Sequence, residues 1–95
     1  MAIIEPIEKL SDATQDMKRA IDSLNEEMGA IDVYNQRADA TTNPELKKIL
    51  LHNANEEKEH AVMLIEWIRQ HDEHFAKEAK EYLFADTKDI AGLEN

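Results

Sequence analysis

Two ionisable residues interrupt an apolar stripe in the second half of the chain. A set of residues there recurs at alternating steps of four and three, which predicts one face of an α-helix. These residues are Leu46, Leu50, Asn53, Glu57, His60, Leu64, Trp67 and His71. Glu57 and His60 are separated by three residues, a rotation of about 300°, so both side chains point to one face. A carboxylate and an imidazole facing a core are costly unless they pair or bind a metal.

A carboxylate occupies a similar position in the first half of the chain. Glu27 lies within an apolar arc, whereas its neighbour Glu26 points away. The arc contains Ala20, Leu24, Ile31 and Tyr34. A di-iron carboxylate bundle takes one Glu from each of two helices and Glu-x-x-His from each of two others. Glu27 with Glu57 and His60 is half of that set, so a symmetric dimer would supply the whole set near its two-fold axis.

The same spacing also fits a salt-bridged or partly solvated polar pair, and this interpretation stays open. The remaining histidines, which are His52, His71 and His74, are interpreted as surface or edge residues. Trp67 and the methionines are interpreted as packing residues.

Two long helices must hold the three residues in place. Ser11 is a plausible N-cap for a helix at about 11–40, and Asn43 with Pro44 opens a second at about 43–71. Thr42 with Glu45 offers an alternative capping box. So short a connection makes the two helices antiparallel neighbours.

The remaining segments are shorter. A third helix is expected at about 73–85, residues 86–95 are expected to be weakly ordered, and residues 1–10 to form an extended arm or a short helical turn. The chain is therefore predicted to be one all-α domain over residues 1–95. It is a two-helix hairpin plus a short C-terminal helix, completing a ferritin-like four-helix bundle by dimerisation.

Composition restricts the possible functions. The chain has 95 residues and no cysteine, which excludes disulfides and thiolate metal sites. Its net charge of −10 argues against nucleic acid and would attract cations, although solubility alone also explains it. No apolar run approaches the roughly 18 residues of a membrane span. Met1–Ile4 is too short for a secretory signal, so a cytoplasmic location is expected.

The chain resembles the encapsulated ferritins, the two-helix ferritin-like cargo of encapsulin shells, over about residues 5–84. Four segments carry the resemblance. They are Glu26 to Ala40 (EEMGAIDVYNQRADA), His52 to Ala61 with Glu56-Glu57-Lys58-Glu59-His60, Glu66-Trp67-Ile68-Arg69, and Tyr82-Leu83-Phe84.

The resemblance implies a ferroxidase that oxidises Fe(II) to Fe(III) with O2 at a di-iron centre between two subunits. Glu27, Glu57 and His60 match the metal ligands, Tyr34 matches a tyrosine near the centre, and Glu26 matches an acidic residue at an outer position where metal enters. It also implies homodimers arranged as an annular homodecamer inside an encapsulin nanocompartment. In such a shell, the ferroxidase would supply Fe(III) for iron storage.

The sequence departs from the family in three places. Gly29 stands where family members have another Glu, and Val33 stands where they have Trp, which puts the outer metal position and the local packing in doubt. A C-terminal targeting motif resembling Gly-Ser-Leu is not found in Ala91–Asn95. Association with a shell is therefore implied by the family alone.

A mechanism and two alternatives follow. Carboxylate and imidazole ligands suit iron, manganese or zinc, and the carboxylate-rich set fits iron cycling between Fe2+ and Fe3+. Glu57 is expected to bridge two metals, with Glu27 and His60 as terminal ligands. Tyr34 would donate a hydrogen bond or an electron, or simply be a core tyrosine. The alternatives are a passive metal-binding oligomer and a non-enzymatic helical adaptor with a buried polar network.

Overall fold

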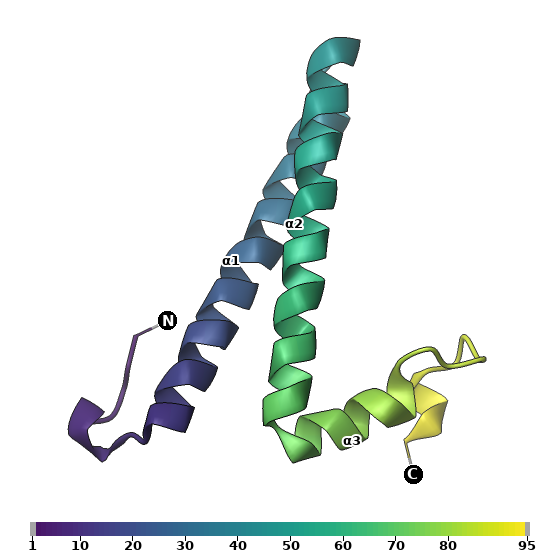
Figure 1. Ribbon diagram of the computed structural model, residues 1–95. Coiled ribbons are helices and arrows are strands. Elements are labelled where there is room, and N and C mark those ends of the chain that lie inside the picture. Colours follow the sequence, from purple (N-terminus) through teal and green to yellow (C-terminus); the bar gives the residue numbers. More distant parts are fainter. Residues whose placement is uncertain (1, 95) are drawn as a thin grey trace.

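The computed structural model describes residues 2–94. A 3-10 turn, η1 (Ile7–Lys9), precedes the long helices α1 (Asp12–Ala40) and α2 (Pro44–His71), and the short helix α3 (Glu73–Tyr82) precedes a second 3-10 turn, η2 (Ala91–Leu93). α1 and α2 form an antiparallel hairpin, and α3 turns away from the end of α2 (Figure 1). Within residues 2–94 there is no strand. The all-α hairpin with a short third helix is confirmed.

Side-chain caps fix where each helix begins. Ser11 Oγ accepts a hydrogen bond from the first turn of α1. Asn43 Oδ1 accepts one from the backbone N–H of Leu46 at 2.9 Å, so Asn43 caps α2, not Thr42. Asp72 caps α3 in the same way. Each oxygen satisfies a backbone donor that has no partner within its own helix.

The C-terminal region differs from its sequence-based description. α3 ends at Tyr82, before the expected boundary near residue 85, because Leu83 is extended and Phe84 has a positive φ of 59°. Residues 91–93 form the turn η2 within the tail that was expected to be weakly ordered. At the other end, η1 agrees with the short helical turn proposed for the arm.

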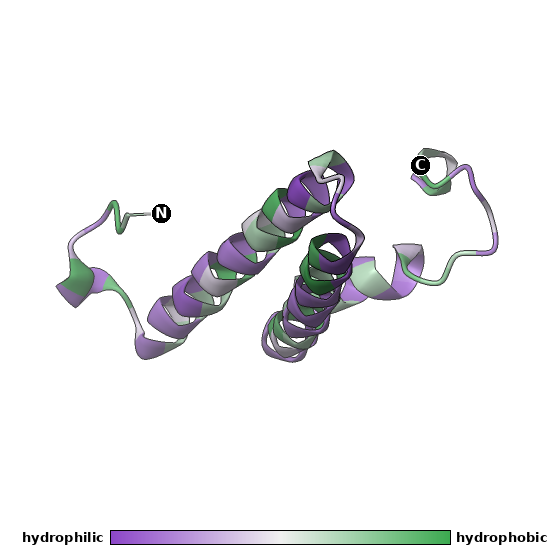
Figure 2. Ribbon diagram, turned by 90° about the horizontal axis from the view of Figure 1, so that it is seen from above, coloured by the Kyte–Doolittle hydropathy of each residue, from purple (hydrophilic) through white to green (hydrophobic). Residues whose placement is uncertain are grey.

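The core between the helices consists mainly of small residues. The buried hydrophobic residues are Ala20, Ala38, Ala54, Ala61 and Ile68. Alanine side chains allow two helix backbones to approach closely, but they bury little apolar area. Hydrophobic and hydrophilic residues alternate around both long helices (Figure 2). Each is therefore amphipathic.

Much apolar surface stays uncovered. The radius of gyration is 17.2 Å, against roughly 12 Å for a compact chain of this length. Large apolar side chains that remain exposed include Ile4, Ile49, Val62, Met63 and Phe84. None of the described helices combines the length and apolar character needed to span a bilayer. The hairpin thus presents faces suited to contact with other protein.

Candidate metal centre

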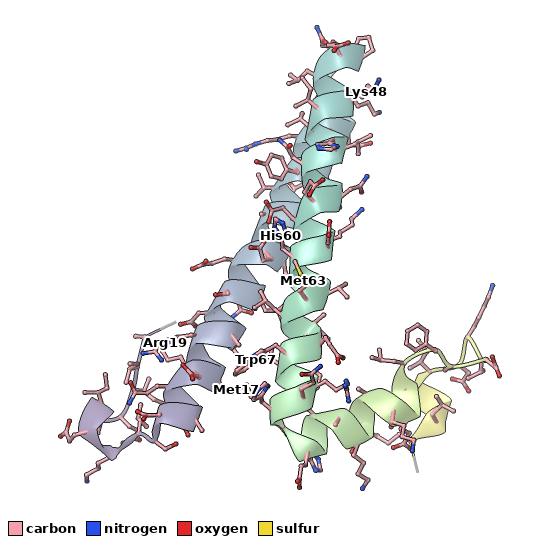
Figure 3. All side chains as sticks on the ribbon, viewed as in Figure 1. Met17, Arg19, Lys48, His60, Met63 and Trp67 are labelled. Atoms are coloured by element: carbon pink, nitrogen blue, oxygen red, sulfur yellow. The ribbon has the colours of Figure 1, made fainter. Side chains whose placement is uncertain are left out.

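The antiparallel hairpin brings the three predicted ligands to one level. Glu27 lies near the middle of α1, and Glu57 and His60 lie near the middle of α2. One ligand atom from each residue can be chosen so that all three lie within 4.8 Å of one another. Figure 3 shows the His60 side chain on the side of α2 that faces α1. Within residues 2–94, no other group of three or more Asp, Glu, His or Cys side chains has this geometry.

The three side chains do not satisfy one another by hydrogen bonding. His60 Nδ1 lies 3.6 Å from Glu27 Oε2 and 3.6 Å from Glu57 Oε2. Both distances exceed the usual range for a hydrogen bond. Glu27 Oε2 is buried and has no hydrogen-bond partner among residues 2–94. A buried carboxylate oxygen without a donor is destabilising, and a bound cation would remove that cost.

In the part of the chain that the structure describes, no lysine or arginine neutralises this group. Among the described residues, neither Glu27 nor Glu57 forms an ion pair with a lysine or arginine. Arginine is used elsewhere on α2, where Arg69 lies 2.6 Å from Glu66 and its hydrogen bonds lower the pKa of that carboxyl to about 2. Two carboxylates and an imidazole without a counter-ion form a donor set suited to a divalent metal.

The group is open on one side of the hairpin. The side chains of Glu27 and Glu57 are each 25% exposed, and that of His60 is 44% exposed. Ile49 and Met63 are exposed, and their spacing from His60 along α2, three turns before it and three residues after it, puts them on the same side of the helix. Trp67 follows on that side, with its ring stacked on His71 at 4.0 Å between centroids. We call this side, with its ligands and uncovered apolar residues, the open face.

The structure places the other predicted site residues apart from the three ligands. Tyr34 lies two turns beyond Glu27 on α1 and is half-buried, and its hydroxyl makes no hydrogen bond to the described residues. Glu26 is exposed and outside the group. Neither residue is in contact with the ligands through a hydrogen bond or ion pair.

The other histidines are not part of the group. His52 lies beside Glu56 at 3.6 Å and His74 beside Glu78 at 3.8 Å, and all four side chains are on the surface. These contacts join residues one turn apart on the same helix. The interpretation of His52, His71 and His74 as surface or edge residues agrees with these positions.

Comparison with known proteins identifies the family. A model of the EncFtn-like family matches residues 2–86. The chain belongs to the EncFtn-like family. It is 50% identical over 82 residues to the encapsulated ferritin-like protein of Rhodospirillum rubrum, an alignment that covers 86% of this chain and 59% of that protein. The resemblance inferred from the sequence is confirmed.

The chain is also similar to another named relative and to a solved structure. It is 41% identical over 59 residues to the encapsulin nanocompartment cargo protein EncC of Myxococcus xanthus, covering 62% of this chain and 45% of that protein. The crystal structure of protein ne0167 from Nitrosomonas europaea matches with a TM-score of 0.88 and 55% identity, over 94% of this chain and 98% of that one. The chain thus has the fold of a solved protein but spans little more than half of the Rhodospirillum relative.

Proposed function

We propose that this protein is a ferroxidase, which oxidises its substrate Fe(II) to Fe(III) with O2 at a dinuclear centre shared by two chains. One observation carries the proposal. Glu27, Glu57 and His60 bring their ligand atoms within 4.8 Å on an open face, and a buried oxygen of Glu27 has no partner. The names of the relatives, which include ferritin-like and encapsulated proteins, support iron as the metal.

A second copy of the chain would complete the ligand set. One hairpin supplies one Glu and one Glu-x-x-His, and a di-iron bundle requires two of each. A two-fold axis passing near the open face would bring two such groups together and form a four-helix bundle. The same contact would cover Ile49 and Met63, which are exposed in the single chain. Metal ligation and burial of apolar surface therefore favour the same pairing.

Each ligand has a distinct role in this proposal. Glu57 would be held in common by the two metal ions, and Glu27 and His60 would each hold one of them. Negatively charged carboxylates attract Fe(III) more strongly than Fe(II), so they favour loss of an electron to O2. Tyr34, half-buried two turns from Glu27, donates a hydrogen bond or an electron near the site. Glu26, exposed beside Glu27, attracts cations to it.

The proposal extends to the oligomer and the compartment in which iron is oxidised. The dimers form an annular homodecamer inside an encapsulin shell in the cytoplasm, where the ferric product is stored. Support comes from relatives named as encapsulated and as encapsulin cargo. The net charge of −10 would also raise the concentration of Fe(II) near the surface of the assembly.

An anaerobic Fe(II) titration followed by an O2 pulse tests the activity. We expect a fast oxidation phase, seen as ferric absorbance and O2 uptake, that saturates at about one Fe(II) per chain, because two metals are shared by two chains. Glu57→Ala should abolish this phase. Glu56→Ala is the matched control, because Glu56 is exposed on the same helix and contacts only His52 among the charged residues described.

Two results would replace the proposal with its alternatives. Fe(II) binding without O2 consumption would make the protein a passive metal-binding oligomer. Absence of binding would leave a non-enzymatic helical adaptor, in which Glu27, Glu57 and His60 form a polar network that fixes the pairing of helices.

A further inference from the structure

A methionine lies beside the candidate metal centre. Met63 follows His60 by three residues on α2, which is about 4.5 Å along the helix axis and a rotation that keeps both side chains on one face. Figure 3 shows its sulfur on the same stretch of α2 as the His60 side chain. Met63 is 58% exposed and is outside the core between α1 and α2. The hairpin therefore does not depend on this side chain for its own packing.

Methionine sulfur is the side chain of this protein best suited to react with peroxide. The chain has no cysteine, so thiol chemistry is excluded. The methionines among the described residues are Met17, Met28 and Met63. A thioether is oxidised to methionine sulfoxide, a polar group that a sulfoxide reductase converts back. Which of these sulfurs reacts first depends on its distance from the source of the oxidant.

The oxidant comes from the proposed ferroxidase function, on which this role of Met63 rests. Two Fe(II) ions give up two electrons, and O2 accepts them with two protons to form H2O2. The pairing that completes the ligand set would also cover Met63, which is exposed in the single chain. Peroxide formed at the shared centre therefore meets this sulfur before it reaches bulk water.

We propose that Met63 traps H2O2 formed at the shared centre and is converted to methionine sulfoxide. A lone pair of Sδ attacks one peroxide oxygen, an S–O bond forms as the O–O bond breaks, and the second oxygen leaves with both protons as water. Sulfur loses two electrons and peroxide gains them, so the step needs no further reactant. Each sulfur reacts once, and a pair of chains can trap about two molecules of H2O2 before its thioethers are exhausted.

Two other methionines serve as internal controls. Met28 is 53% exposed, close to the value for Met63, and directly follows Glu27, but its side chain is turned about 100° around α1 from that of Glu27. Met17 is half-buried and lies ten residues before Glu27 on the same helix. Bulk peroxide should reach Met28 about as readily as Met63, so a preference for Met63 during iron oxidation isolates the effect of its position.

Mass spectrometry of peptides after iron oxidation tests this role directly. Protein loaded with Fe(II) without O2 receives a pulse of isotopically heavy O2 in the presence of catalase, an enzyme too large to enter a contact between two chains. We expect heavy oxygen on Met63 in several-fold excess over Met28 and Met17, and Glu57→Ala should abolish this labelling. In a second arm, ordinary H2O2 is added to metal-free protein. There the excess at Met63 over Met28 should disappear, and catalase should prevent oxidation at both positions.

Release of H2O2 into solution provides the second measurement. Met63→Leu removes the sulfur and keeps an apolar side chain of similar size, so the fast phase of iron oxidation should be retained. This variant should release H2O2 from the first round of oxidation. The unmodified protein should release it only after about two rounds, because each round yields one H2O2 and a pair of chains has two Met63 sulfurs. Met28→Leu is the matched control and should keep the delay.

The outcomes separate the role of Met63 from the proposed function. Fast iron oxidation with equal labelling of Met63 and Met28, or with no delay in peroxide release, would overturn the role of Met63 and leave the ferroxidase in place. Absence of the fast phase in the unmodified protein would overturn both.

Discussion

The contact between α1 and α2 contains two kinds of layer. In the alanine layers the side chains are almost completely buried, with exposed fractions of 0% for Ala54 and 3% for Ala61. Between them on the same helix lies Glu57, whose side chain is 25% exposed, and it faces Glu27, which has an unpartnered buried oxygen. The alanine layers are complete within one chain, and the ligand layer is not.

This difference indicates that the alanine layers stabilise the hairpin, whereas the ligand layer forms the candidate metal site. A larger side chain in a complete layer should lower the free energy of unfolding, because the close-packed neighbours have no space to accommodate it. An incomplete polar layer should respond in the opposite way, because replacing an unsatisfied charge by an apolar group removes a cost. Substitutions in the two layers are therefore expected to have opposite effects on stability, and those in the ligand layer are also expected to remove metal binding.

The largest expected effect on stability is in the alanine layer. Ala54→Leu forces a larger side chain into a position with no exposed surface, so the free energy of unfolding should fall by about 1–3 kcal/mol. Ala13→Leu makes the same chemical change at an exposed position of α1 and should change stability by less than about 0.5 kcal/mol. Chemical denaturation in the absence of metal measures both. Equal effects of the two variants would contradict the description of this layer as complete.

The ligand layer should behave differently. In metal-free protein, Glu27→Leu should leave the free energy of unfolding unchanged or raise it by about 1 kcal/mol, because it removes an unsatisfied buried oxygen. Anaerobic Fe(II) should raise the melting temperature of the unmodified protein and not that of the variant. Glu26→Leu, at the exposed neighbouring position, should keep the response to Fe(II). Strong destabilisation of metal-free Glu27→Leu would mean that this carboxylate supports the fold.

A smaller effect is expected on the outer surface of α1 near the ligand layer. A Cβ added at Gly29 would meet nothing within 4 Å. Gly29→Ala should therefore raise the free energy of helix unfolding by up to about 1 kcal/mol, because glycine is the weaker helix former. Thermal unfolding measures this. A loss of stability would instead indicate that a neighbouring chain approaches α1 closely at this point.

The smallest effect belongs to an ion pair outside both layers. Hydrogen bonds from Arg69, and then from Gln70, lower the pKa of Glu66 from 4.5 to about 2. Because the folded pKa lies below the unfolded one, the stabilisation is present above about pH 4.5 and is lost as pH falls through about 2. An NMR titration of the Glu66 carboxyl should give this low pKa, and Arg69→Ala should raise it, because the hydrogen bond that lowers it most is lost. A midpoint near 4.5 for Glu66 would show that the pair does not persist in solution.

Much of this architecture could be predicted from the sequence, because it depends on local signals. The start of α1 follows from Ser11, whose side chain caps the helix as expected, and the start of α2 falls at Asn43, one of the two caps that the sequence offered. The grouping of Glu27, Glu57 and His60 follows from helical spacing together with the short antiparallel connection. Helical periodicity is regular enough that positions on one face can be assigned without coordinates.

Other features depend on tertiary geometry and could not be predicted. The choice between Asn43 and Thr42 as the cap was left open by the sequence, and the end of α3 was placed too late because no glycine or proline marks it. The conformation of Phe84 ends that helix instead. The unpartnered oxygen of Glu27 depends on the axial register of two helices, which periodicity does not determine.

Native mass spectrometry under anaerobic conditions, with increasing Fe(II), tests the sharing of the ligand layer most directly. The mass of each species gives both the number of chains and the number of bound metal ions. We predict that single chains carry no iron and that two-chain species carry about two, because each chain supplies only half of the ligands. Single chains that bind iron as tightly as pairs would contradict the proposal that a second copy completes the site.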